Sequence, residues 1–405
     1  MIVAWKRKLA ERQQEIAQKY YEETGEWLMN LYSTVSENMV PEFMSVYNEM
    51  LSTLNKKQKP APADLYKLDS YWELQKKARS SLEDIGKDIH SYFNSQLKSA
   101  FISIYEGIAP DELEKTCPMS DEEIQEIIDK PWGRKPKNLQ ERIWIHMTVL
   151  WDKLFGDLMN CTIKNIPAKD LEASLQERFS KTRNALVTLF SDENTHLRGR
   201  AVIRRCNDDR RTVGNELNFL GSYVRTYGND EELEAYATVS SAFDEYAIAG
   251  ADGVAPANIW DDSDEDNEDD WTEDSEENQG ARGDDLERWE IHASDGCEPC
   301  ADLDDMIWAE TNENGPVPVP VHPNCLCDIV PAALSIFGQD AGKYADLAFK
   351  AAGGGLRGII FGGLVGAALI TLGVMMGDEY NGTGGSGCAT PQEWLEKWGD
   401  KYPVY

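Results

Sequence analysis

The sequence predicts a mainly α protein: a long helical N-terminal body, a small α+β Cys/His knuckle module, and a Gly-rich hydrophobic C-terminal helix. Three observations predict this class. Residues 1 to about 250 carry apolar side chains at helical spacing, four of the eight cysteines lie between Cys297 and Cys327, and Ile359–Met376 contains no charge. In chain order we expect an N-terminal helical region (1–135), a second helical region (136–250), an acidic flexible linker (251–285), the Cys/His module (286–332), the hydrophobic helical segment (333–378) and a tail helix (379–405).

The helical body shows its boundaries and one clear packing face. Ser120 and Glu123 form a capping-box pattern before a helix, while Pro60–Pro62 and Asp129–Asn138 are typical of connections. Apolar residues three and four positions apart mark one face of a long amphipathic helix, which predicts that they pack in the core. These residues are Ile143, Met147, Leu150, Leu154, Leu158 and Cys161.

One helix of this body is expected to carry a basic stripe. If the segment is helical, arginines seven residues apart fall at nearly the same angle around the axis. Guanidinium groups contact phosphate with two parallel hydrogen bonds, so DNA is one candidate partner. Pairing with the many carboxylates of this protein, or with an acidic partner surface, is the other interpretation. The candidate residues are Arg198, Arg200, Arg204, Arg205, Arg210 and Arg211.

The chain is strongly acidic, with a formal net charge of −32. Because phosphate binding needs clustered Lys and Arg, this charge argues against general coating of nucleic acid. The run Asp261–Asn278 holds 12 acidic residues and no basic residue, and it has almost no apolar side chain to bury. We interpret it as a solvated linker or loop. Mimicry of nucleic acid toward a basic partner is the alternative.

The cysteines then gather in a short module. Met1–Glu23 has no apolar core that would indicate a secretory signal, so we expect synthesis in the cytoplasm, where clustered thiols more often bind metal than cross-link. Asp305–Glu310 reads as a short strand and Asn312–Gly315 as a turn, which together predict a hairpin that joins two Cys-bearing turns. Zinc is the candidate metal, because it takes four Cys and His ligands in tetrahedral geometry.

More candidate ligands are present than zinc needs. The primary set is Cys297, Cys300, His322, Cys325 and Cys327, with His292 as a weaker candidate. Reduced thiols or disulfides are the competing interpretation of the cluster. A catalytic thiol is a third interpretation, but no base or oxyanion arrangement accompanies the cysteines.

The module resembles the C-terminal motif of the phage Mu F-like family of minor head proteins. Trp289 and Asp295 precede the Cys297–Cys300 pair, and 24 residues separate Cys300 from Cys325 of "HPNCLC" (His322–Cys327). The match covers only about 45 residues, and two features depart from the family: Leu326 stands where Arg is usual, and the acidic run lies just upstream. The resemblance implies a portal-associated virion protein inside the capsid, present in several copies. It also implies a role in head assembly and in DNA packaging or ejection, with the portal protein and other head proteins as partners.

A membrane-like segment follows the module. Ile359–Met376 has 18 uncharged residues, and Gly358, Gly362 and Gly366 are each four positions apart, a spacing that lets helices approach closely in lipid. A buried Gly-rich helix that packs on the portal or on another copy is the alternative. After it, Thr390, Pro391 and Glu393 predict the start of the tail helix.

The functional expectation is therefore a non-enzymatic virion protein. No phosphate-binding loop, paired-carboxylate site or nucleophile motif stands out in the sequence. The alternative is a membrane-active protein that is stored in the head, ejected with the DNA, and then inserts residues 358–377 into the host envelope to aid genome delivery.

Overall fold

A computed structural model describes residues 4–54, 59–132, 137–214 and 216–234 as an almost continuous helical body. It also describes 236–237, 240–241, 288–292, 300, 306–309, 327–331 and 397. The helices are α1 (Ala4–Thr53), α2 (Pro62–Leu65), α3 (Asp69–Gly107), α4 (Asp121–Asp129), α5 (Leu139–Lys164), α6 (Ala168–Val213) and α7 (Glu216–Tyr227). The predicted mainly α class is confirmed for the described part of the chain.

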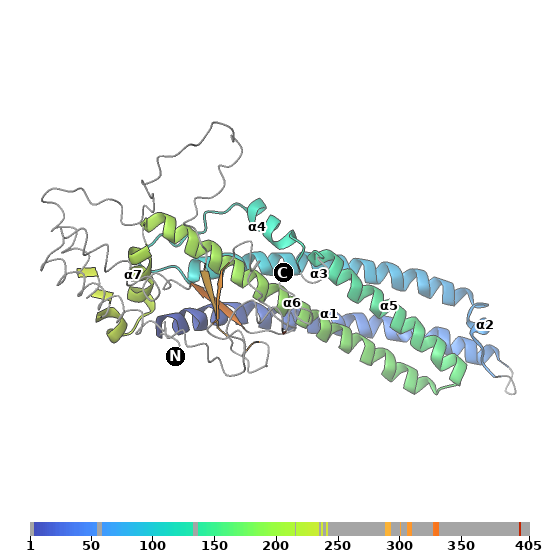
Figure 1. Ribbon diagram of the computed structural model, residues 1–405. Coiled ribbons are helices and arrows are strands. Elements are labelled where there is room, and N and C mark those ends of the chain that lie inside the picture. Colours follow the sequence, from blue (N-terminus) through green and yellow to red (C-terminus); the bar gives the residue numbers. More distant parts are fainter. Residues whose placement is uncertain are drawn as a thin grey trace, which may run out of the picture.

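The long helices α1, α3, α5 and α6 lie side by side in an elongated bundle (Figure 1). With 50 residues, α1 is about 75 Å long at 1.5 Å per residue. One hydrophobic core runs through all four helices, so the predicted regions 1–135 and 136–250 are packed together. The predicted apolar face of α5 is confirmed, because all six of its residues are buried: Ile143, Met147, Leu150, Leu154, Leu158 and Cys161.

Local signals explain where these helices begin and end. At the start of α4 the Ser120 hydroxyl accepts a hydrogen bond from Glu123 N at 3.2 Å, and Ser120 N donates to the Glu123 carboxylate at 2.7 Å. This confirms the predicted capping box. At the end of α5, Asn165 adopts a left-handed conformation with φ 51°, and Gly214 ends α6 in the same way with φ 79°.

The middle of α6 is buried on every face, since almost every residue from Leu197 to Cys206 is shielded from solvent. Polar residues there need internal partners. Arg205 pairs with Asp209, with 2.6 Å between Arg205 Nη2 and Asp209 Oδ1, and the Tyr223 hydroxyl donates to Asp209 at 2.8 Å. This network joins α6 to α7.

A small antiparallel sheet lies against the bundle near the N-terminal half of α1 (Figure 1). Its strands β1 (Arg288–His292), β2 (Met306–Ala309) and β3 (Asp328–Pro331) are arranged in the order β2-β1-β3. Trp289 pairs with Trp308 on one side and with Pro331 on the other. The predicted short strand in 305–310 is confirmed by β2. The sheet also places the strand before Cys297 beside the strand that follows Cys327.

Several predicted segments lie outside the described residues. They are the acidic linker (251–285), the hydrophobic segment with Gly358, Gly362 and Gly366, and, apart from Lys397, the tail helix (379–405). Within the described chain, no helix is long and apolar enough to cross a membrane.

Candidate functional site

The candidate site is the place where β3 of the Cys/His module docks on α1 and α6. Cys327 immediately precedes β3 and is fully buried, as is Cys300. Two buried thiols suit half of a tetrahedral zinc site, which needs two further ligands. The other predicted ligands, Cys297, His322 and Cys325, lie outside the described residues, and so does the side chain of His292. Within the described part, no group of three metal-ligating side chains comes together.

A buried ion pair fixes β3 to α6. The distance between Arg198 Nη2 and Asp328 Oδ1 is 3.0 Å, and their side chains are 5% and 0% exposed. The same guanidinium nitrogen donates to the main-chain oxygen of Cys327 at 2.9 Å. From α1, the Gln14 amide donates to the other carboxylate oxygen of Asp328. Arg198 thus contacts both the residue that carries a candidate thiol ligand and the first residue of β3.

Two further features let β3 approach the helices closely. The Gln13 side chain of α1 donates through Nε2 to the main-chain oxygen of Ile329 at 3.1 Å. Gly199 of α6 leaves room for Ile329, because a Cβ atom at residue 199 would lie 2.7 Å from Ile329 Cδ1. The strand is therefore held by one ion pair, by side-chain bonds to its backbone and by one close apolar contact.

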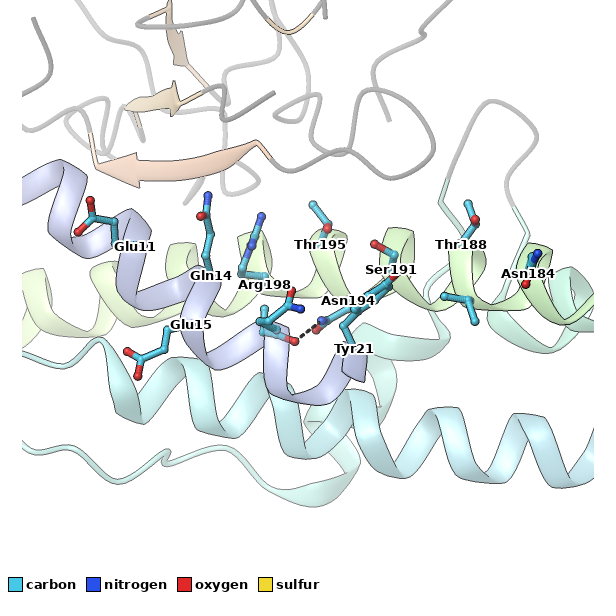
Figure 2. Close-up of a pocket in the computed structure, with 13 residues that line it drawn as sticks. Glu11, Gln14, Glu15, Tyr21, Asn184, Thr188, Ser191, Asn194, Thr195 and Arg198 are labelled. Atoms are coloured by element: carbon cyan, nitrogen blue, oxygen red, sulfur yellow. Dashed lines mark hydrogen bonds between the residues drawn. The ribbon is translucent and has the colours of Figure 1, made fainter. Parts of the chain in front are cut away.

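A groove of about 890 Å³ runs along α1 and α6 next to this docking site. Figure 2 shows side chains from the two helices facing it, with Arg198 and Gln14 on its walls and Asn194 donating to the main-chain oxygen of Ala17 at 3.2 Å. The groove is lined by Glu11, Gln14, Glu15, Ala17, Gln18, Tyr21, Asn184, Val187, Thr188, Ser191, Asn194, Thr195 and Arg198. Apart from Arg198, these residues are not predicted from the sequence, since their polar spacing on either helix resembles that of an ordinary solvated face.

The predicted basic stripe is helical, and its arginines fall into different environments. Arg198 and Arg205 are buried, 4% and 2% exposed, in ion pairs with Asp328 and Asp209. Arg204 is partly exposed and bonds to Asp208 at 3.0 Å. These two buried arginines therefore pair with carboxylates of the chain itself, which is the second of the two interpretations.

The remaining arginines of the stripe lie nearer the surface. Arg210 lies over the Phe219 ring, 4.5 Å from its centroid, and bonds to Asn207. Arg211 is the one exposed arginine of the stripe, with 73% of its side chain accessible and an Asp208 oxygen 3.7 Å away. Arg200 is partly buried and also has a partner.

A cluster of charged and aromatic side chains links α6 to α5 and to the segment that precedes α5. Glu193 is 2% exposed and accepts a hydrogen bond from the Trp132 indole at 2.7 Å. Arg142 lies 3.4 Å from the other carboxylate oxygen and 3.9 Å from the Trp132 ring centroid, while His196 stacks on that ring at 4.4 Å. Burial raises the pKa of Glu193 to about 7, against the lowering effect of Arg142 and the indole.

The isolated cysteines have no sign of reactivity. Cys161 is buried as part of the predicted face of α5, Cys206 is also buried, and Cys117 is half-buried. Burial raises the pKa of the Cys206 thiol to about 12, so this thiol stays protonated at neutral pH.

Comparison of the chain with protein-family models, with curated proteins and with solved structures finds no match in any of the three.

Proposed function

We propose that this chain is a non-enzymatic minor head protein of a bacteriophage that acts inside the capsid at or near the portal. The observation that carries the proposal is the order and spacing of Trp289, Asp295, the Cys297–Cys300 pair and His322–Cys327. The pairing of β1 with β3 supports treating these residues as one module, since it brings the two ends of the motif side by side.

The architecture supports a protein that acts through interfaces. An elongated helical bundle, with α1 about 75 Å long, carries the module on its side. The module is attached by a desolvated ion pair, Arg198–Asp328, which resists rearrangement because separating the two charges would leave both uncompensated. Such a body holds a small docking module at a fixed position relative to its long axis. The proposed partners are the portal protein, other head proteins and packaged DNA, with several copies of the chain in each virion.

Zinc is the proposed cofactor of the module. Cys300 and Cys327 would hold it together with two of Cys297, His322 and Cys325. When bound, zinc supplies a structural cross-link in a module that has little core of its own. Arg198 would then fix the backbone next to one thiolate ligand, and Gln13 and Gln14 would hold β3 in register against α1.

Quantitative mass spectrometry of purified virions and of emptied heads tests the location. The proposal predicts a few copies of the chain in every virion, in a fixed ratio to the portal protein, which stay with the emptied heads. A chain found only in lysates and never in purified virions would refute it.

The uncharged segment Ile359–Met376 favours a second candidate, a membrane-active protein that leaves the head with the DNA. Here Gly358, Gly362 and Gly366 would form the contact between helices in the host envelope. Fractionation of infected cells separates the two functions. Recovery of the chain in host membranes, with emptied heads that lack it, would favour ejection.

A further inference from the structure

The end of the bundle opposite the sheet presents ordered aromatic side chains to solvent. Tyr66, next to α2, is 47% exposed and Trp72 of α3 is 52% exposed. The Trp72 indole donates to the main-chain oxygen of Tyr66 at 3.1 Å, and the two rings stack with centroids 5.9 Å apart. Tyr71, which is buried, contacts both rings and continues to Phe155 in the core. These rings are therefore held in place before any partner binds, which lowers the entropic cost of binding.

This tip is basic in an acidic protein. Leu51–Lys77 holds six lysines against three acidic residues, and the turn between α5 and α6 adds Lys164 and Lys169 with Asp170 and Glu172 beside them. Ile163, 58% exposed, extends the apolar surface beside Lys164. Within the described residues, no ion pair is made by four exposed lysines of the tip: Lys59, Lys76, Lys164 and Lys169.

The carboxylates at the tip cancel only part of this charge. Asp64 is bound to Lys67 at 2.9 Å and to Ala61 N, and Glu49 accepts a hydrogen bond from the Ser70 hydroxyl at 2.6 Å. Charges elsewhere on the bundle act weakly here, because salt screens exposed charges beyond about 8 Å at physiological ionic strength. The tip therefore has a local basic character despite the net charge of −32.

We propose that this tip binds the acidic run Asp261–Asn278 of a second copy of the chain. The run combines 12 acidic residues with Trp271, so it offers carboxylates to the lysines and an indole to the Tyr66–Trp72 platform. Opposite charges steer the encounter, and aromatic side chains contribute most to the energy of such contacts. This inference goes beyond the function proposed above and does not depend on it.

Geometry assigns the run to another copy. The sheet is attached near Gln13, which is 40 residues before the end of α1 at Thr53, or about 60 Å along the helix. Asn278 precedes Arg288 of β1 by ten residues, which span at most about 35 Å when fully extended. The end of the run therefore cannot reach the tip of its own chain. Trp271 lies 17 residues before Arg288 and would need almost complete extension of the chain, about 60 Å, to reach that tip. The tip of a neighbouring copy imposes no such limit.

Sedimentation velocity of the full-length chain at low and high salt tests the proposal. The wild-type chain should self-associate at low ionic strength and dissociate as salt rises. The tip variant Lys164→Glu/Lys169→Glu should weaken association by about five-fold or more. Trp72→Ala should weaken association as well, and the size of this weakening should depend less on salt than that of the lysine variant. The matched control Lys19→Glu/Lys115→Glu changes charge equally at exposed positions away from the tip and should associate like the wild type.

A second arm identifies the occupant. Neutralising the acidic residues of 261–278 as Asn and Gln should abolish association, and a labelled peptide of this run should bind the neutralised chain but not its Lys164→Glu/Lys169→Glu version. A wild-type chain that stays monomeric at low salt would overturn the proposal. Association that survives neutralisation of the run would also overturn it, because the tip would then bind something else.

Discussion

At the scale of single residues, the attachment of β3 depends on the Arg198–Asp328 ion pair. Both side chains are almost completely removed from water, and their 3.0 Å contact compensates a large desolvation cost. If both side chains were replaced by apolar ones, no buried charge would be left without a partner. Removing one of them would leave the other buried and unpaired, and that asymmetry gives a test.

Arg198→Met should lower the free energy of unfolding by about 3–5 kcal/mol, because Asp328 would remain charged in an apolar site. Urea denaturation measures the loss, and Arg198→Met/Asp328→Leu should recover part of it. Arg211→Met is the matched control on the same helix, since Arg211 is 73% exposed and its loss should cost less than about 0.5 kcal/mol. Equal stability of the Arg198 and Arg211 variants would show that β3 is not held in this way.

Glu193 predicts a stability that depends on pH. Burial raises its pKa in the folded chain to about 7, above its ordinary value of 4.5. The folded state therefore holds a proton that the unfolded state releases, so the stabilisation is complete below 4.5 and disappears as pH rises toward 7. The groups that face the carboxyl are Trp132, Arg142 and the neighbouring Asp192.

In urea denaturation, the wild type should lose on the order of 3 kcal/mol between about pH 5 and pH 8 through this group. Glu193→Gln keeps an acceptor for the Trp132 indole and should remove that loss, while Glu11→Gln on the exposed face of α1 should keep it. An unchanged pH profile in Glu193→Gln would mean that this carboxyl does not titrate with the fold.

Sequence reasoning at this scale found the arginines of α6 but not what they bind. Spacing of seven residues predicts a shared face, and the helix confirms that geometry. The spacing of the arginines carries no information about Asp328, which lies 130 positions further along the chain and reaches Arg198 only through folding. Glu193 and Trp132 were missed for the same reason, since a single acidic residue in an amphipathic helix looks solvated until its neighbours are known.

At the scale of elements, glycine at position 199 leaves room for the Ile329 side chain where β3 approaches α6. A Cβ there would lie 2.7 Å from Ile329 Cδ1, whereas a Cβ at Gly156 of α5 would meet nothing within 4 Å. Glycine in a helix is otherwise unfavourable by about 0.5–1 kcal/mol relative to alanine. The two glycines therefore predict opposite effects of substitution.

Gly199→Val should loosen β3 by overpacking, with a loss of about 1–3 kcal/mol and faster amide hydrogen exchange in residues 328–331. Gly156→Ala should instead raise stability by about 0.5–1 kcal/mol and leave that exchange unchanged. If the backbone amides of β3 exchange at the same rate in both variants, the contact of β3 with α6 does not protect these amides from exchange.

Helix positions could be predicted well because their signals are local. The capping box at Ser120 and the apolar spacing of α5 act within a few residues, so both are confirmed. The groove between α1 and α6 could not be predicted, because it combines residues such as Gln18 and Ser191 from helices far apart in sequence. The docking of β3 depends likewise on contacts that only the folded chain brings together.

At the scale of the whole molecule, the module should bind about one zinc ion per chain, as its Cys and His residues suggest. Elemental analysis of purified protein gives the stoichiometry. Cys300→Ser should reduce it, whereas Cys117→Ser, outside the module, should not. Less than about a tenth of an equivalent of zinc, together with intact folding in chelator, would exclude a structural metal.

The whole molecule also has a recognisable outline for locating it in a particle. A bundle built on α1, about 75 Å long and with a small sheet beside its N-terminal half, is large enough to be identified in a density map. If the chain lies at the portal as proposed, its position and orientation would show which surfaces meet the portal and how the copies are arranged.

The most direct test of the central claim is a cryo-EM reconstruction of the portal vertex in DNA-filled heads, without imposed icosahedral symmetry. We predict density on the inner side of that vertex into which the α1–α3–α5–α6 bundle and its attached sheet fit. Heads from a strain lacking the chain should show no density there. An inner vertex that is identical with and without the chain would contradict the proposed function.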